Sequence, residues 1–181
     1  MRRLVLAALS ASVFATPATS EVVSASPNAF HVRHSEPVVA TPQEAWDLLR
    51  QPALWWNGEH SYSLDAANFT MDLKPGGCFC ERLPEGGFVE HMRVLSYVPG
   101  KELVLEGMLG PLRTAPATGV LVFKIESEGP NARVTSDFKV VGFPQGDGEM
   151  WAAAVDGVIG EQMKRLRARV ASKGAPGSPM R

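Results

Sequence analysis

Alternation of apolar and polar residues organises the middle of the chain. In residues 69–74 and 119–127 every second position is apolar, which predicts strands with one buried face. Further strand-like segments follow one another between turns rich in Pro and Gly. They occupy residues 78–83, 88–97, 102–109 and 133–143. The pattern therefore predicts a meander of about six antiparallel strands.

A helical period replaces the alternation at two places. Residues 149–171 carry one apolar stripe at helical spacing, which predicts a long C-terminal helix. Thr41 and Glu44 form a capping-box pattern that predicts a short helix ending near Arg50. A strand at residues 30–39 precedes this helix. The order of elements predicts an α+β domain, in which a curved antiparallel sheet of about seven strands wraps around the C-terminal helix.

The two ends of the chain differ from this domain. Residues 1–20 begin with a positive stretch, continue with a short apolar run and end in small residues, which predicts a secretory signal peptide. An anchored N-terminus is the alternative, although the run is short for a bilayer span. Residues 21–28 are predicted to be a linker, 29–171 the folded domain and 172–181 a disordered tail. We expect a periplasmic or secreted protein without integral membrane association after cleavage.

The composition argues against some classes of function but does not identify a function. The chain has 181 residues and a net charge of -1, so no basic field draws it to nucleic acid. Four Trp and seven Met suit an irregular core or an apolar pocket equally well. The sequence has no nucleotide-binding loop and no Ser-His-Asp spacing. We expect no cofactor, and the oligomeric state is left open.

The run GGCFCERLPEGGFVEHMRVLSYVPGKELVLEG, from Gly76 to Gly107, carries a resemblance. Together with Trp55-Trp56 and the order of elements, it resembles the helix-grip (SRPBCC/START-like) superfamily. That group includes lipid-transfer domains, the birch-pollen allergen, polyketide cyclases and chaperone-ATPase-activator-like domains. The likeness covers about residues 30–170 and implies a cavity for an apolar ligand between sheet and helix. It implies no universal catalytic residue.

The hairpin within this run holds most of the candidate chemistry. A four-residue loop at 84–87 would place Glu81 opposite Glu90, on the more apolar face and toward the closing helix. Two carboxylates placed there would repel, and burial would favour protonation of at least one near neutral pH. Such a pair could transfer protons or anchor a polar group. A register error of one residue would instead place both in solvent, and arginines could neutralise them.

The cysteines would lie on the opposite, outer face of this hairpin. In an exported protein Cys78 and Cys80 could form a disulfide, but that bridge would need a bulge. With His91 they offer only three ligands to a metal, and soft-ligand sites usually show a second cluster. We therefore favour plain strand cysteines and predict no metal site.

These observations favour an exported protein that binds a small apolar or amphipathic molecule between the sheet and the C-terminal helix. One alternative is a cyclase- or dehydratase-like enzyme that uses Glu81 and Glu90. Another is a protein-interaction module, which export disfavours because the usual partner of such relatives is cytosolic. Trp56 could equally be core packing. The predicted ligand-binding residues are Trp56, Phe69, Met71, Phe79, Glu81, Glu90, Met92, Leu105, Phe123, Trp151, Val155 and Ile159.

Overall fold

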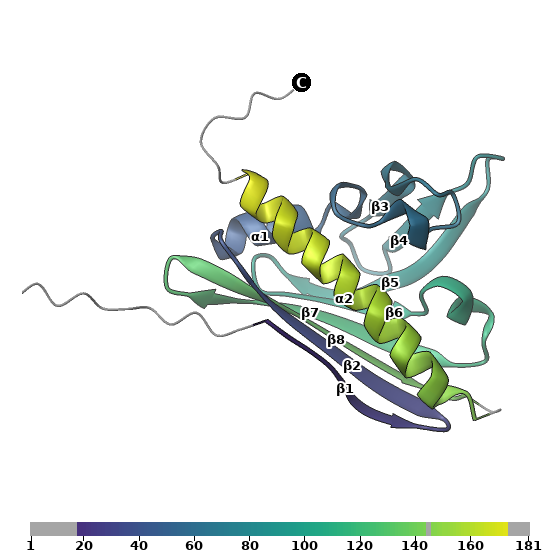
Figure 1. The fold of residues 1–181 in the computed structure, drawn as a ribbon. Helices are drawn as coiled ribbons and strands as arrows, with labels where there is room; N and C mark the ends of the chain where they lie inside the picture. The colour runs from purple at the N-terminus through teal and green to yellow at the C-terminus, as the bar shows by residue number, and fades with distance from the viewer. Residues whose placement is uncertain (1–17, 144–145, 174–181) are drawn as a thin grey trace, which may run out of the picture.

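The computed structural model describes residues 18–143 and 146–173. Residues 1–17 of the predicted signal peptide and residues 174–181 of the predicted tail lie outside this range. Within it, one antiparallel sheet packs against one long helix, α2 (Gly148–Lys173), which crosses the concave face of the sheet (Figure 1). The predicted α+β helix-grip architecture is confirmed.

The sheet has eight strands in the order β1-β2-β8-β7-β6-β5-β4-β3. The predicted meander accounts for β3 to β8, and the predicted first strand is β2. The strands are β1 (Thr19–Ser26), β2 (Ala29–Val38), β3 (Phe69–Met71), β4 (Cys78–Arg82), β5 (Phe88–Val98), β6 (Glu102–Gly107), β7 (Thr118–Glu128) and β8 (Asn131–Val141).

Strand β1 corrects one expectation. Residues 21–28 were predicted to be a linker, but most of them pair with β2 along the edge of the sheet. Val22 and Val23 are each 41% exposed, so this strand buries little apolar surface. An edge strand is paired on one side only and needs no continuous apolar face. Its polar composition therefore resembled that of a linker.

The short helix α1 (Pro42–Leu49) begins as predicted. Thr41 Oγ1 accepts a hydrogen bond from the Glu44 N–H, and the Glu44 carboxylate accepts one from the Thr41 N–H. Four single 3-10 turns complete the connections: η1 (Pro52–Leu54), η2 (Gly58–His60), η3 (Ala66–Asn68) and η4 (Gly110–Thr114).

Helix α2 fixes the segment after α1 in place. Its apolar stripe is buried as predicted, with Ile159 and Leu166 at 3% and 0% exposure. Arg165 Nε donates to the carbonyl oxygen of Trp55 at 3.1 Å, and Arg169 Nε donates to that of Leu54 at 3.0 Å. These charged donors hold the double-tryptophan segment against the helix. These contacts therefore fix the position of the segment that forms one wall of the candidate site described below.

Candidate functional site

A cavity of about 320 Å³ opens between the loop that follows the double tryptophan, turn η4 and helix α2. Its lining is mostly apolar, with a few polar residues from the loop and one histidine from strand β5. The lining residues are Trp56, Glu59, His60, Ser61, Tyr62, His91, Leu109, Gly110, Pro111, Leu112, Trp151, Ala154, Val155, Val158 and Ile159.

Four of the predicted ligand-binding residues line this cavity: Trp56, Trp151, Val155 and Ile159. The other apolar candidates pack into the core of the sheet layer instead. Those with at most 3% exposure are Phe69, Phe79, Met92, Leu105 and Phe123, and Met71 packs against the same cluster. The cavity therefore lies nearer to the loops and helix than the sequence predicted. The proposed binding roles of the core residues stay predictions.

The register of the β4–β5 hairpin differs from the prediction on one side of a bulge. Phe79 pairs with Met92 as predicted, but Cys80 pairs with Glu90 and Glu81 pairs with Val89. His91 is the extra residue between the two registers. The loop spans residues 83–87, one residue more than predicted, and the bulge restores the expected pairing beyond it.

This register separates the two glutamates that were predicted to face each other. Glu81 is fully buried, as expected, with 0% exposure. Glu90 turns to the outer face, where its carboxylate accepts a hydrogen bond from Arg93 Nε at 2.6 Å. The predicted carboxylate pair in the cavity is therefore wrong. The bulge turns His91 inward in its place, at 5% exposure.

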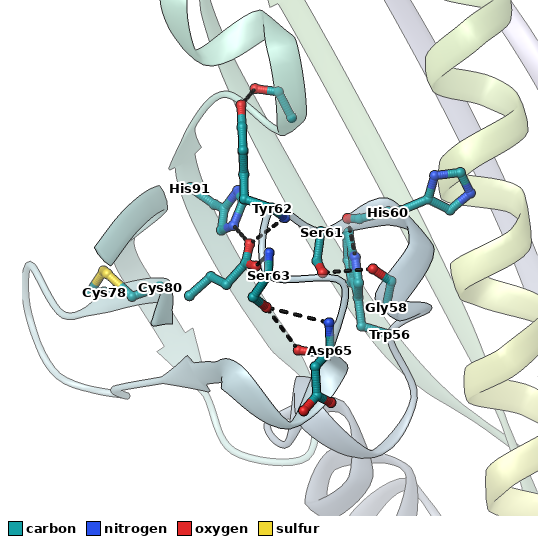
Figure 2. A network of polar contacts seen from close by, with 12 residues as sticks. Trp56, Gly58, His60, Ser61, Tyr62, Ser63, Asp65, Cys78, Cys80 and His91 are labelled. Atoms are coloured by element: carbon teal, nitrogen blue, oxygen red, sulfur yellow. Dashed lines mark hydrogen bonds and ion pairs between the residues drawn. A yellow bond between two sulfur atoms is a disulfide. The ribbon is translucent and has the colours of Figure 1, made fainter. Parts of the chain in front are cut away.

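The buried Glu81 carboxylate accepts three hydrogen bonds. The backbone N–H groups of Tyr62 and Ser63 donate to it at 3.1 and 2.5 Å. His91 Nε2 lies 3.1 Å from Glu81 Oε2. Figure 2 shows Tyr62, Ser63 and His91 meeting at this point, close to strand β4. A carboxylate from the sheet thus holds both a cavity-lining loop and a cavity-lining histidine.

These contacts set the protonation states of the pair. Burial raises the pKa of Glu81, but hydrogen bonds from Ser63, Tyr62 and His91 together outweigh it and hold the pKa below its usual value. Burial lowers the pKa of His91, and the opposing influence of Glu81 does not restore it. At neutral pH the pair is therefore an ionised carboxylate and a neutral imidazole. With Glu81 as acceptor, the imidazole proton lies on Nε2.

Aromatic rings surround the His91 imidazole. Tyr62, Phe69 and Phe79 have ring centroids 6.0, 5.3 and 5.6 Å from it. Tyr62 itself spans the site, because its hydroxyl donates to the carbonyl oxygen of Gly110 at 2.9 Å. The guanidinium of Arg113 lies 5.7 Å from the centre of the Tyr62 ring. The rings restrict how the imidazole can turn, so Glu81 and its neighbours fix one orientation.

Cys78 and Cys80 form a disulfide, which corrects the prediction of plain strand cysteines. Their Cα atoms lie 5.3 Å apart, within the range a disulfide can bridge. Figure 2 shows the bridge between Cys78 and Cys80. Along β4 it encloses Phe79 and directly precedes Glu81. Among the described residues, no group of three or more His, Cys, Asp or Glu could hold a metal ion.

Sequence reasoning missed His91, because it placed that residue on the outer face. It also missed the loop residues His60, Ser61 and Tyr62, which follow a segment without periodicity. One signal was available for His91. His91 lies in a largely apolar strand, next to Glu90, which was predicted to face the other side of the sheet. A β-bulge reverses which of two such neighbours faces inward, so this pattern was compatible with a bulge.

The arrangement leaves an apolar space that is bordered by several polar side chains, His91 among them. An imidazole oriented by a carboxylate is also the usual form of a general base.

Among the described residues, no helix is long and apolar enough to cross a membrane.

No protein-family model and no curated protein sequence matches the chain. Solved structures do resemble it. An uncharacterised protein from Rhizobium leguminosarum has 14% identity and a TM-score of 0.59, over 87% of this chain and 99% of its own. A conserved protein of unknown function from Enterococcus faecalis has 14% identity and a TM-score of 0.57, over 87% and 79%.

A third similar structure is the di-domain ARO/CYC protein StfQ of the steffimycin biosynthetic pathway. It has 11% identity and a TM-score of 0.56, over 81% of this chain and 52% of its own. Identities this low show shared architecture alone. The chain is a helix-grip-like α+β domain.

Proposed function

We propose that this is an exported protein that binds one small apolar or amphipathic molecule in the cavity between loop 56–62, turn η4 and α2. The observation that carries the proposal is the cavity itself, with about 320 Å³ of space and a mostly apolar lining. That volume lies at the lower end of ligand pockets, which span about 300–1,000 Å³. The likeness to an ARO/CYC protein and the sequence pattern of a signal peptide agree with it.

The polar lining residues support this proposal, because several of them already direct their donors to acceptors within the protein. Ser61 Oγ donates to the Gly58 carbonyl oxygen at 2.6 Å, and the His60 ring hydrogen-bonds the Glu161 carboxylate at 2.9 Å. The Tyr62 hydroxyl likewise donates to the Gly110 carbonyl oxygen, so these side chains have few donors left for a ligand. Such a wall favours an apolar occupant.

Native mass spectrometry of the protein purified from its own host tests the proposal. The expected result is an added mass that is lost on denaturation. Ala154→Phe would fill the cavity, because Ala154 lines it. Ala153→Phe is the matched control, since Ala153 is a neighbour that is also exposed but does not line the cavity. An added mass that survives in Ala154→Phe, or none in the native protein, would count against the cavity as a binding site.

A second candidate function is acid–base catalysis on a bound ligand, favoured by the Glu81–His91 pair. The pair replaces the two glutamates expected from the sequence. With any substrate that is identified, Glu81→Gln should then abolish turnover, whereas Glu90→Gln should leave it unchanged. Normal turnover in Glu81→Gln would exclude this candidate.

A further inference from the structure

One atom beside the cavity has no partner in the part of the chain that the structure describes. His91 Nδ1 is buried and makes no hydrogen bond there. Leaving a buried polar atom unpaired costs about 1–3 kcal/mol, so such atoms are rare without a reason. His91 also lines the cavity. The unpaired atom therefore belongs to a side chain that borders the empty space.

The partner that Nδ1 requires follows from the other side of the ring. Since the Nε2 proton is directed to Glu81 Oε2, at 3.1 Å, Nδ1 carries a lone pair and acts as an acceptor. The backbone N–H groups of Tyr62 and Ser63 hold Glu81 in place, so the tautomer is set by three fixed contacts. Only a hydrogen-bond donor can satisfy Nδ1 in this state.

We propose that His91 Nδ1 is the polar anchor of the cavity and accepts a hydrogen bond from a hydroxyl or N–H group on an otherwise apolar ligand. Glu81 is the positioning residue that fixes the tautomer of His91. This inference rests on the proposed binding function and narrows its ligand class. An apolar molecule with a hydroxyl group is selected over the same molecule without one.

The cavity also limits the size of this ligand. Its volume of about 320 Å³ lies at the lower end of ligand pockets, which span about 300–1,000 Å³. A ligand of one or two fused rings fits this space. Ser61 and Tyr62 already direct their hydroxyl protons to the Gly58 and Gly110 carbonyl oxygens, and the His60 ring is paired with Glu161, so among these lining residues His91 offers the buried acceptor that has no partner.

The first test is nitrogen NMR of the full protein labelled with ¹⁵N-histidine. The probes are 2-naphthol, which has a hydroxyl group, and naphthalene, which has the same rings without it. The His91 signals should show a protonated Nε2 before addition. 2-Naphthol should then shift the Nδ1 signal in the direction of an accepted hydrogen bond, and naphthalene should not. A protonated Nδ1 in the free protein, or equal shifts with both probes, would overturn the inference.

Calorimetry on His91→Phe supplies the second test, because Phe keeps a ring of similar shape without nitrogen atoms. Affinity for 2-naphthol should fall about tenfold, and affinity for naphthalene should change less than twofold. In Glu81→Gln the preference for 2-naphthol should fall, and the NMR tautomer signature of His91 should change with it. Equal affinities of the two probes for the unmodified protein overturn this inference but leave the proposed function standing. Binding of neither probe overturns both.

Discussion

Two buried histidines of this protein each lie beside a carboxylate, and they differ in what surrounds them. His34 on β2 is 1% exposed and its Nε2 lies 2.9 Å from Asp156 Oδ1 of α2. His91 on β5 is 5% exposed and its Nε2 lies 3.1 Å from Glu81 Oε2. Burial lowers the pKa of both imidazoles. In the burial of the histidine and in the direction of its pKa shift the two pairs are alike.

The carboxylates and the space around the two histidines differ. The Asp156 side chain is 27% exposed, whereas that of Glu81 is 0% exposed and accepts two backbone hydrogen bonds. His34 packs against α2 at Gly160, and His91 lines the cavity. Burial of a histidine next to a carboxylate therefore does not identify a site. The features that distinguish His91 are a fully buried carboxylate held by backbone hydrogen bonds and an adjacent cavity, and on these the proposed site rests.

The largest expected difference between the pairs comes from deleting each carboxylate. Glu81→Ala should lower the free energy of unfolding by about 3–5 kcal/mol, because it leaves the N–H groups of Tyr62 and Ser63 and the imidazole of His91 without their acceptor. Asp156→Ala should lower it by about 1 kcal/mol, since Asp156 is partly solvated. Urea unfolding measures both. Similar losses in the two variants would contradict the difference in their surroundings.

The packing role of His34 can be tested through the glycines of α2. A Cβ added at Gly160 would lie 2.6 Å from His34 Cε1, so Gly160→Ala should destabilise the protein by about 2 kcal/mol. A Cβ at Gly157 would meet nothing within 4 Å, so Gly157→Ala should stabilise it by about 0.5–1 kcal/mol through helix propensity. Thermal unfolding of the two variants provides the comparison. A neutral Gly160→Ala would show that His34 is not tightly packed there.

Removal of the disulfide should change the surroundings of the Glu81–His91 pair and leave those of the Asp156–His34 pair unchanged. Cys78 and Cys80 close a loop of only three residues, so their replacement by alanine should cost about 1.5 kcal/mol by the loop-entropy relation. Because the bridge precedes Glu81 on β4, the imidazole NMR signals of His91 should shift in that variant. Those of His34 should stay unchanged. Shifts at both histidines would mean that the disulfide organises the whole domain.

Both histidines should make the protein less stable in mild acid. Each has a folded-state pKa below its ordinary value of 6.5, so the unfolded chain takes up protons first as the pH falls through 6.5. The contribution is present above pH 6.5 and declines toward the folded pKa. The groups around the rings are Asp156, Glu36 and Lys164 for His34, and Glu81 and Arg113 for His91.

We expect the free energy of unfolding to fall by about 1 kcal/mol between pH 7.5 and 6, at most about 1.4 kcal/mol per pH unit for each histidine. Unfolding in urea at the two pH values measures this. His34→Phe and His91→Phe should each reduce the loss. A protein that becomes more stable at pH 6 would contradict the lowered pKa values.

The sequence predicted the fold well and the site only in part. Alternation, capping and the apolar stripe of α2 are local patterns, and each predicted its element correctly. The orientation of Glu90 and His91 depends on one added loop residue and one bulge. Since each shifts the side-chain alternation by one, a local pattern cannot reveal them. The loop after Trp56 is held by contacts with α2 and Glu81 that are distant in sequence, so it carried no periodic signal.

The central claim is that a small apolar molecule binds between loop 56–62, η4 and α2. Isotope-filtered nuclear Overhauser spectroscopy tests it most directly, with unlabelled 2-naphthol and a ¹³C-labelled protein. We predict contacts from the probe protons to the methyl groups of Val155 and Ile159 and to the ring of Trp151, which line the cavity. Contacts only to exposed residues such as Val120 and Val141, or no contacts at millimolar probe, would contradict the claim.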